Sequence, residues 1–380
     1  MIYFDNAATG GRKPDSVLTA VSSAIKVCAN PGRSGHKLSV SCAKQVQNCR
    51  HTLNGYFNGY GFDHVIFTKN CTEALNIALF GVLQQGDHVI VSCMEHNSVL
   101  RPIQHLAQQG IITYSVCPLV GTPINGDAAL DLDALRRLLR PNTRLVAITA
   151  ASNVNGHIPD LIRVRKALPE DTLLLCDAAQ GGGHQPIDMQ GAGIDLLSVA
   201  GHKGMLGIQG SGALLFSHRV QPAPIIFGGT GSMSLSLEMP DFYPDALEAG
   251  TLCYPAVLSL LEGTRYLVHH QDEMSEKILS LTAYLLRGLS ELPNYTAYSK
   301  PNPCGIVAFS HKRFQSEQIA ETLSTKYSIA VRGGLHCAPL MHEALGTFDG
   351  GLVRVSLSHY NHLSELDILL RALKEIDSHE

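Results

Sequence analysis

The sequence lacks several features that would point to other classes of protein. It contains no tryptophan, aromatic residues make up only 6% of its 380 residues, and 29 basic against 33 acidic residues give a net charge of -4. No block of like charge occurs along the chain. We therefore expect no nucleic-acid partner and no binding to a membrane surface.

Long apolar runs are also missing. No run approaches the length of a membrane span, and the first residues, Met1 to Asn6, lack the basic and apolar regions of a signal peptide. We therefore expect a cytoplasmic protein. With 45% hydrophobic and 16% charged content the chain can bury a sizeable core, and its length favours two domains.

The cysteines indicate neither a disulfide framework nor a metal site. In a chain of this length their irregular spacing favours reduced, mostly buried thiols. Cys93 with His96, and His336 beside Cys337, have spacings that occur in metal sites, but no second pair completes a tetrahedral set, so we expect no metal. The ten cysteines are Cys28, Cys42, Cys49, Cys71, Cys93, Cys117, Cys176, Cys253, Cys304 and Cys337.

Short apolar runs alternate with helical patterns between residues 60 and 220. Continuous apolar runs fit strands that are buried on both faces, and the intervening helices favour a mainly parallel sheet. The sequence therefore predicts an α/β domain with a central sheet. The expected strands are 64–68, 88–92, 112–116, 144–149, 172–177, 195–199 and 212–216.

The rest of the chain predicts a long helix and a small α+β domain. Helical spacing runs from Pro255 to about Leu292, and Ser364 with Asp367 predicts a capping box for the last helix. Strands are expected at 305–309, 328–332 and 352–356, with a helix at 316–327. The expected divisions are an N-terminal segment packing near the active site and small domain (1–15), a large cofactor-binding domain (16–255), and a linking helix with the small domain (256–380).

Lys203 and Asp177 are the first residues that indicate a chemistry. Lys203 lies on a glycine-flanked turn between two apolar runs, and Asp177 closes an earlier apolar run. A constrained, partly desolvated turn favours the neutral amine, which can form a Schiff base with a carbonyl. In pyridoxal phosphate enzymes an acidic residue keeps the pyridine nitrogen protonated. Taken singly, a loop lysine or a helix-capping aspartate is the more common interpretation.

Polar residues follow five of the expected strands, where ligands collect in open α/β sheets. The segment from Thr68 to Glu73 also opens a helix, whose free amides and positive dipole end can hold a phosphate, with Thr72 adding a hydroxyl. There is no Walker lysine motif, and Gly207 to Gly212 lacks dinucleotide spacing, so nucleotide binding is not favoured. The five segments are 68–73, 95–97, 152–155, 177–180 and 200–203.

Ordered motifs resemble class V aminotransferases nearly from end to end. The branch that contains cysteine desulfurases and selenocysteine lyases is indicated by the closing Val331-Arg-Gly-Gly-Leu-His-Cys-Ala-Pro-Leu and Val353-Arg-Val-Ser. The resemblance implies the fold type I of pyridoxal phosphate-dependent transferases. The other motifs are Phe4-Asp-Asn-Ala-Ala-Thr, Asn70-Cys-Thr-Glu-Ala-Leu-Asn, Met94-Glu-His-Asn-Ser-Val, Ser152-Asn-Val-Asn-Gly, Asp177-Ala-Ala-Gln, Gly201-His-Lys and Glu248-Ala-Gly-Thr.

The resemblance implies a role for each matching residue around pyridoxal 5'-phosphate. Lys203 would form the Schiff base, Asp177 would contact the pyridine nitrogen, and His96 would stack over the ring and assist proton transfer. Thr251, in a Gly-Thr pair, would reach the phosphate of the neighbouring subunit, which implies a homodimer. The other implied contacts are Gln180 and Asn153 at the ring hydroxyl, and Thr72, His202 and the amide of Cys71 at the phosphate.

The substrate side of the site is implied in the same way. Arg354 would clamp the substrate α-carboxylate, because a planar guanidinium offers two parallel donors. Arg332 and Asn6 would be auxiliary substrate contacts. Cys337, in a glycine-containing segment beside His336, would be the sulfur-accepting nucleophile. The alternatives are strand arginines paired with acids and an inert core cysteine.

The implied reaction converts L-cysteine to L-alanine and transfers the sulfur to Cys337 as a persulfide, then to an acceptor protein or small thiol. Within the family, selenocysteine lyase acting on L-selenocysteine, or another lyase or aminotransferase with the same cofactor, is the alternative. A non-catalytic sulfur-carrier scaffold is the alternative outside enzymes. Two departures bear on this choice. Ala200 stands where the family commonly has a Ser or Thr phosphate ligand, and Leu335 replaces a histidine of the nucleophile loop.

Overall fold

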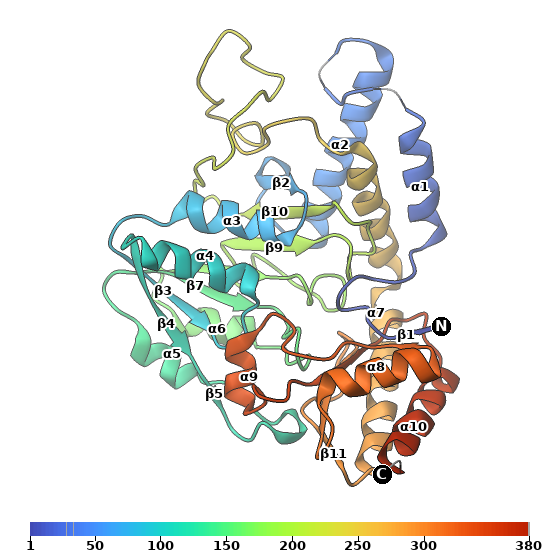
Figure 1. The fold of residues 1–380 in the computed structure, drawn as a ribbon. Helices are drawn as coiled ribbons and strands as arrows, with labels where there is room; N and C mark the ends of the chain where they lie inside the picture. Colours follow the sequence, from blue (N-terminus) through green and yellow to red (C-terminus); the bar gives the residue numbers. More distant parts are fainter. Residues whose placement is uncertain (28, 33, 379–380) are drawn as a thin grey trace.

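The central sheet confirms all seven strands expected between residues 60 and 220. The computed structural model describes residues 1–378 apart from 28 and 33. The strands are β2 (Val65–Thr68), β3 (Asp87–Ser92), β4 (Ile112–Cys117), β7 (Thr143–Thr149), β8 (Leu173–Asp177), β9 (Leu196–Ala200) and β10 (Gly212–Phe216). Their order is β2-β10-β9-β8-β7-β3-β4 (Figure 1). Since β10 is antiparallel to both neighbours, the other six strands all run in one direction.

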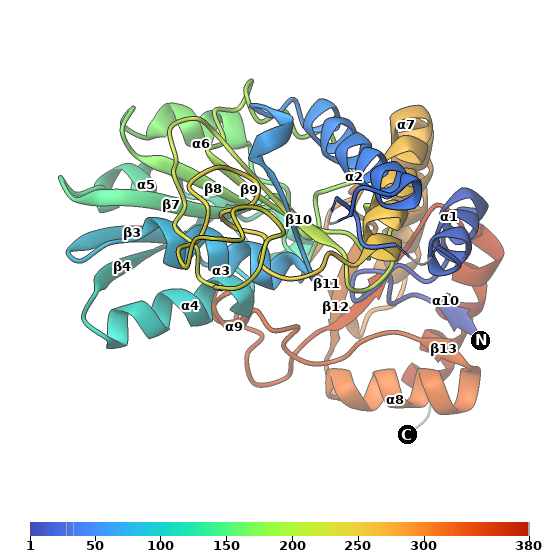
Figure 2. The same cartoon turned by 90° about the horizontal axis from the view of Figure 1, so that it is seen from above.

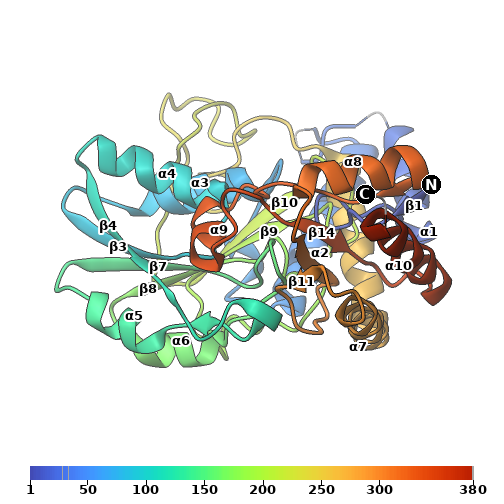
Figure 3. The ribbon, with the colours of Figure 1, turned by 60° about the horizontal axis from the view of Figure 1, so that its bottom comes forward.

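Both faces of this sheet are buried because its side chains alternate between two apolar clusters. In β7, Val146 and Ile148 belong to one cluster, whereas Leu145 and Ala147 belong to the other. Helices lie on opposite sides of the sheet and cover both clusters (Figure 3). On one side lie α3 (Cys71–Val82) and α4 (Asn97–Gln108), and on the other α2 (Lys37–Tyr56), α5 (Leu132–Leu138) and α6 (Leu161–Ala167).

The longest helix, α7 (Tyr254–Ser290), connects the sheet to the C-terminal part of the chain. Its bounds agree with the span expected from Pro255 to about Leu292. Leu260 near its start joins the core of the large sheet, and Leu285 near its end joins the core of the smaller part. Helix α1 (Asp15–Ile25) packs alongside α7. The helix therefore contributes to both cores.

The C-terminal part contains a three-stranded antiparallel sheet with helices. The strand expected at 328–332 is β13 (Ile329–Ala330), which stands apart from that sheet and pairs in parallel with β1 (Ile2–Tyr3), the first strand of the chain (Figure 2). The N-terminal segment therefore lies on the C-terminal part. The remaining elements are β11 (Tyr295–Ala297), β12 (Ile306–His311), β14 (Val353–Ser356), α8 (Ser316–Tyr327), α9 (Pro339–Leu345), α10 (Leu363–Ser378) and the short pair β5 (Leu119–Val120) and β6 (Ala129–Leu130).

The capping box predicted at Ser364 and Asp367 is wrong. Helix α10 begins at Leu363, so Ser364 already lies inside it. The side chain of Glu365 accepts a hydrogen bond from the amide of His362 at 3.0 Å. The Asp367 carboxylate instead accepts from the hydroxyl of Tyr284 on α7 at 2.5 Å. A tertiary contact therefore occupies the residue that the local pattern assigned to the cap.

Most of the described cysteines are buried thiols, as expected. Cys28 lies outside the described residues, and the other nine are free, with only Cys253 and Cys337 exposed among them. Within the described part of the chain, no helix is both long and apolar enough to cross a membrane. The boundaries of the three expected divisions stay predictions.

A buried ion pair fixes the segment 222–253 against the edge strand β2. Arg50 on α2 and Glu248 are 4% and 7% exposed, and their charged atoms lie 2.6 Å apart. Glu248 also accepts from the amide of Phe67 at 2.6 Å, and Arg50 donates to the carbonyl of Val65. Each charge is therefore compensated away from water, and removing either one leaves the other uncompensated.

Glu248→Gln tests the importance of this pair. The substitution leaves the buried Arg50 guanidinium without its counter-charge, so the free energy of unfolding should fall by about 3–5 kcal/mol in urea denaturation. As a control, Glu262→Gln removes the partner of Arg265, which is 48% exposed, and should change stability by less than about 1 kcal/mol. Equal effects of the two substitutions would contradict the assignment.

Candidate active site

A pocket opens where the carboxyl ends of β2, β3, β7, β8 and β9 meet. Eight of the nine predicted cofactor contacts line it, and the ninth, Thr251, does not. Because these five strands run in one direction, their carboxyl ends share one edge of the sheet, where ligands bind in such folds. The predicted residues in the lining are Cys71, Thr72, His96, Asn153, Asp177, Gln180, His202 and Lys203.

Lys203 lies on the turn that follows β9, and two glycines determine the path of that turn. A Cβ at Gly201 would lie 2.1 Å from Oγ of Ser211. A Cβ at Gly204 would lie 2.3 Å from the carbonyl oxygen of Gly182. Neither position has room for a side chain, so the glycines bring the lysine backbone close to its neighbours.

The N-terminal segment holds the same turn from the other side. The carbonyl of His202 accepts hydrogen bonds from the amide of Gly10 at 3.0 Å and from Nζ of Lys13 at 2.8 Å. Nδ1 of the His202 ring lies 3.0 Å from Oγ1 of Thr9. Burial lowers the pKa of His202 to about 4, so its imidazole is neutral at pH 7. Residues of the N-terminal segment therefore help to hold the lysine turn in place.

A lysine and a carboxylate share the pocket. Burial lowers the pKa of Lys203, which enriches its neutral amine, while the charge of Asp177 opposes the shift. Asp177 is the last residue of β8 and is buried. Its Oδ1 accepts from the amide of Ala179 at 2.9 Å and from Sγ of Cys71 at 3.3 Å. The amine of Lys203 can bind an aldehyde, and the carboxylate of Asp177 can contact a protonated ring nitrogen. Together they suit a cofactor that has both groups.

His96 caps α4 and brings a neutral ring to the pocket. Its Nδ1 accepts from the amide of Ser98 at 3.0 Å, so the proton of the neutral ring lies on Nε2. Burial lowers the pKa of His96 to about 4 against the opposing charge of Asp177. A neutral imidazole has an aromatic face for stacking and a nitrogen that can exchange a proton.

The N-terminus of α3 forms a polar end of the pocket. Asn70 caps the helix by accepting from the amide of Glu73 at 2.9 Å. The amides of Cys71 and Thr72, at the first two helical positions, have no partner within the helix. Oγ1 of Thr72 lies 2.9 Å from Oγ of Ser98. Amides and hydroxyls together fit a phosphate.

Ser98, Asp5 and Lys13 are site residues that sequence reasoning did not single out. Ser98 follows His96 by two residues in one of the quoted motifs, and Asp5 stands in another, so both motifs held a signal. No local pattern marks Lys13, whose contact depends on the fold. Ala200 lines the pocket, as its motif predicts, but supplies no hydroxyl.

Arg354 reaches the site from β14 and is already paired. It is 1% exposed, and its Nη2 lies 2.9 Å from Oδ1 of Asp5. Nη1 donates to the carbonyl of Asn153 at 2.9 Å, while Nε is buried without a partner among the described residues. The arginine predicted to clamp the substrate carboxylate therefore already holds an acid from the N-terminal segment.

Cys337 is exposed on a loop that is bonded to the pocket. The carbonyl of Cys337 accepts from the amide of Asn97 at 2.8 Å, and that of His336 accepts from Nδ2 of Asn153 at 2.7 Å. His336 and Cys337 have φ values of 52° and 57°, which cost roughly 1–3 kcal/mol each in residues other than glycine. Nη2 of Arg332 lies 3.9 Å from Sγ of Cys337. The loop is therefore strained and held beside the pocket.

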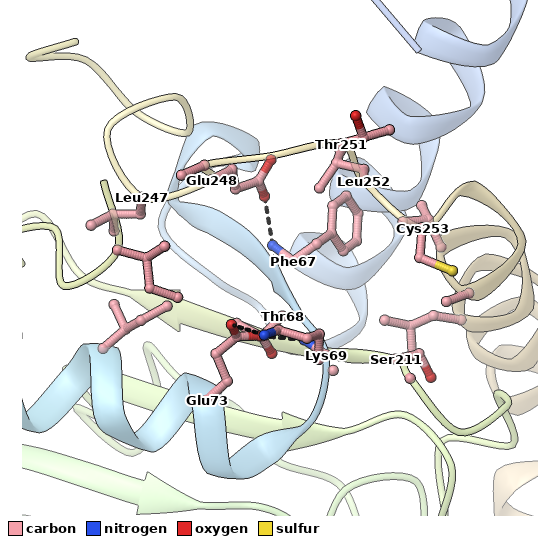
Figure 4. A pocket seen from close by; sticks show the side chains of 18 residues that line it. Phe67, Thr68, Lys69, Glu73, Ser211, Leu247, Glu248, Thr251, Leu252 and Cys253 are labelled. Carbon is pink, nitrogen blue, oxygen red and sulfur yellow. Dashed lines mark hydrogen bonds and ion pairs between the residues drawn. The ribbon is translucent and has the colours of Figure 1, made fainter. Parts of the chain in front are cut away.

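Asn6 and Thr251 lie outside the pocket lining. Nδ2 of Asn6 donates to the carbonyl of Ser356 at 2.9 Å, and its Oδ1 accepts from the amide of Gly11 at 3.1 Å. Thr251 lines a second pocket between β2, the start of α7 and the segment 222–253 (Figure 4). Gln180 is in the lining, where its Nε2 donates to the carbonyl of Ala7 at 2.9 Å. The roles predicted for these three residues stay predictions.

The family follows from comparison with known proteins. A profile described as aminotransferase class-V matches residues 2–369. The chain belongs to the class V aminotransferase family. Enzymes of this family depend in general on pyridoxal phosphate, and the resemblance and fold class expected from the sequence are confirmed.

Relatives of this class V protein include cysteine desulfurases. A probable cysteine desulfurase of Methanothermobacter thermautotrophicus is 31% identical over 99% of this chain and 94% of its own length. A cysteine desulfurase of Pectobacterium atrosepticum is 29% identical over 99% and 93%, respectively. The apo structure of a cysteine desulfurase from Thermococcus onnurineus, 29% identical, has a TM-score of 0.88 over 99% of this chain and 94% of that one. A cysteine desulfurase from Escherichia coli, 27% identical, has a TM-score of 0.85 over 98% and 94%.

The buried His336 gives this class V protein a predictable response to acid. Burial lowers the pKa of His336 to about 2, whereas an unfolded histidine titrates near 6.5. Because the unfolded chain binds the proton more readily, the stability that His336 contributes is present above pH 6.5 and is lost as the pH falls. His336→Gln should therefore reduce the stability lost between pH 7 and pH 5 by about 2 kcal/mol.

Urea denaturation at the two pH values measures this effect. The exposed His269 provides a control, since His269→Gln should leave the wild-type pH dependence unchanged. A variant with Gln at position 336 that loses as much stability as the wild type would contradict the prediction.

Proposed function

We propose that this chain is a pyridoxal phosphate-dependent cysteine desulfurase, which converts L-cysteine to L-alanine and passes the sulfur through Cys337 to an acceptor. One observation carries the proposal. The exposed Cys337 lies on a loop bonded to Asn153, a residue of the pocket that contains Lys203 and Asp177. A nucleophilic thiol and a lysine–carboxylate pocket are the two parts that such a reaction needs.

The pocket residues fit pyridoxal 5'-phosphate. Thr72, Ser98 and the first amides of α3 would hold the phosphate, Asp177 would hold the ring nitrogen, and Lys203 would bind the aldehyde carbon. The bound cofactor would supply an electron sink that makes the Cα proton of an amino acid removable. His96 would cover one face of the ring and exclude water from it.

The protein's own groups would orient the substrate and move its proton. Nζ of Lys203 would take the Cα proton, because burial favours its neutral form. The Arg354 guanidinium would orient the substrate carboxylate from β14, and Asp5 would keep that guanidinium in place. Arg332, on the loop that contains Cys337, would add a second positive charge near the substrate.

Cys337 would carry out the sulfur transfer. Its thiolate Sγ would attack the sulfur of L-cysteine, forming an S–S bond while the substrate C–S bond breaks. The electron pair would remain with the three-carbon fragment, which takes up a proton and leaves as L-alanine. A thiol of an acceptor protein or small molecule would then take the terminal sulfur from the persulfide. Transfer to an acceptor protein or small thiol and a cytoplasmic location stay predictions.

Cys337→Ala tests the reaction type. Sulfide release from L-cysteine should fall on the order of 1,000-fold, because the variant lacks the nucleophile. The visible spectrum of the cofactor-loaded variant should still respond to L-cysteine, because the pocket is intact. Mass spectrometry of the wild type after L-cysteine should find one added sulfur on Cys337.

Cys253→Ala is the matched control, since Cys253 is the other exposed cysteine in the described chain. This variant should keep the wild-type rate. Full sulfide release by Cys337→Ala would remove the persulfide step. Wild-type selenide release from L-selenocysteine by that variant, with loss of the cysteine reaction, would favour selenocysteine lyase instead.

We also propose that two copies form a homodimer through the segment 222–253. This segment projects from the large part (Figure 1) and carries Phe227, 72% exposed, with Leu235 and Leu237 fully exposed. Apolar side chains gathered on a projecting segment are typical of an interaction surface. Thr251 belongs to the same segment, which agrees with its implied contact to a neighbouring subunit.

The double substitution Leu235→Asp and Leu237→Asp tests the dimer. Placing two charges in the interface should convert a dimeric wild type largely to monomer in sedimentation velocity. Leu363→Asp, at a 49% exposed leucine at the start of α10, should leave the dimer intact. A monomeric wild type would refute the proposal, as would a double variant that sediments as a dimer.

A further inference from the structure

Cys71 is a buried cysteine whose thiol lies at the catalytic pocket. It is the first residue of α3, it is 7% exposed, and it lines the same pocket as Asp177 and Lys203. Its Sγ lies 3.3 Å from Oδ1 of Asp177. Among the described cysteines, Cys71 is the one whose thiol donates to a carboxylate, whereas those of Cys49 and Cys117 donate to backbone carbonyls. The sequence pattern assigned a task only to the amide of Cys71.

The contact has a defined direction. A carboxylate only accepts hydrogen bonds, so the thiol must be the donor. Burial raises the pKa of Cys71 well above its usual value, and the charge of Asp177 raises it further, so the sulfur keeps its proton. Cys71 is therefore a neutral donor.

The two donors to Asp177 share one oxygen. The amide of Ala179 donates to Oδ1 at 2.9 Å, and the thiol of Cys71 donates to the same atom. No described residue donates to Oδ2. The backbone amide and the thiol come from different elements, so together they fix how the carboxyl group is turned about its bond to the chain. Oδ2 is thereby left for another donor.

Glu95 is another acid near Asp177, but it adds little negative charge there. Glu95 is buried, and burial raises its pKa to about 8, so it is mostly neutral at pH 7. It accepts from the amide of Thr149 at 2.8 Å and from the hydroxyl of Ser92. Lys203 also lies near Asp177, and burial lowers the pKa of its amine. Among the described residues that line the pocket, Asp177 is the one carboxylate available to a protonated ring nitrogen.

We propose that Cys71 is a positioning residue for the cofactor: its thiol holds Oδ1 of Asp177 so that Oδ2 is presented to the ring nitrogen. The inference rests on the proposed function, because it requires pyridoxal phosphate in this pocket. It assigns the Cys71 side chain a task separate from phosphate binding by its amide. The thiol acts through Asp177 and makes no bond to substrate.

Comparing two cofactors distinguishes the contact of the Cys71 thiol with Asp177 from phosphate binding by the Cys71 amide. The apoprotein is titrated with pyridoxal phosphate and with its 1-deaza analogue, in which a C–H group replaces the ring nitrogen, and binding is followed by fluorescence. Cys71→Ala should weaken binding of pyridoxal phosphate about fivefold, the scale of one hydrogen bond. Binding of the analogue should change less than about twofold, because it has no nitrogen for Asp177 to contact. Cys71→Ser, which keeps a donor, should restore most of the affinity for pyridoxal phosphate.

Two further variants test whether a change in side-chain packing explains the loss of cofactor affinity. Cys71→Val fills the space without a donor and should behave like Cys71→Ala, so comparing Val with Ser decides the question if the alanine variant folds poorly. Cys304→Ala removes a buried thiol away from the pocket and should leave both affinities unchanged.

The outcomes distinguish this inference from the proposed function. Equal weakening for both cofactors would overturn the positioning role and assign the effect to packing or to the phosphate. Unchanged or tighter binding of pyridoxal phosphate by Cys71→Ala and Cys71→Val would overturn it too. A wild type that binds neither cofactor would instead refute the cofactor assignment, and with it the proposed function.

Discussion

The buried charge of Arg354 is the interaction on which the assembly of the site depends. A guanidinium that is 1% exposed requires compensation from its surroundings, and it receives this from Asp5 and from the carbonyl of Asn153. These partners come from the N-terminal segment and from the loop that follows β7, while Arg354 belongs to the small sheet. Satisfying one charge therefore brings three parts of the chain together. Asn153 also bonds the loop of Cys337, so Arg354 and this loop share one support.

Burial gives chemically identical residues different tasks in this molecule. Cys71 and Cys337 are both thiols at the site, but one is enclosed beside a carboxylate and the other is exposed beside a guanidinium. Burial keeps both His96 and His336 neutral. The ring of His96 lines the pocket, whereas the ring of His336 packs against that of His342. The environment therefore matters as much as the residue type in setting chemical character.

The sequence predicted the strands of the large sheet well, but it predicted poorly which distant side chains contact one another. Continuous apolar runs located most strands of the large sheet, because strands buried on both faces must be apolar throughout. Five of the motifs located the pocket, because each of those five comes at the carboxyl end of a strand at the same edge of the sheet. The pair of Arg354 and Asp5 spans 349 positions and depends on the fold, so no local pattern reveals it. The Asp367 prediction failed for the same reason, since its partner Tyr284 comes from another helix.

The pairing of β1 with β13 has a consequence for the order in which the enzyme is made. Ile2 and Tyr3 have no strand to pair with until Ile329 and Ala330 have been translated. Asp5 likewise cannot form its ion pair until Arg354 has been translated. The turn that contains Lys203 requires neither β13 nor Arg354. A nascent chain that already contains Lys203 and Asp177 therefore still lacks Cys337 and Arg354. The contacts that join the N-terminal segment, the pocket and β14 can form only after Arg354 has been translated.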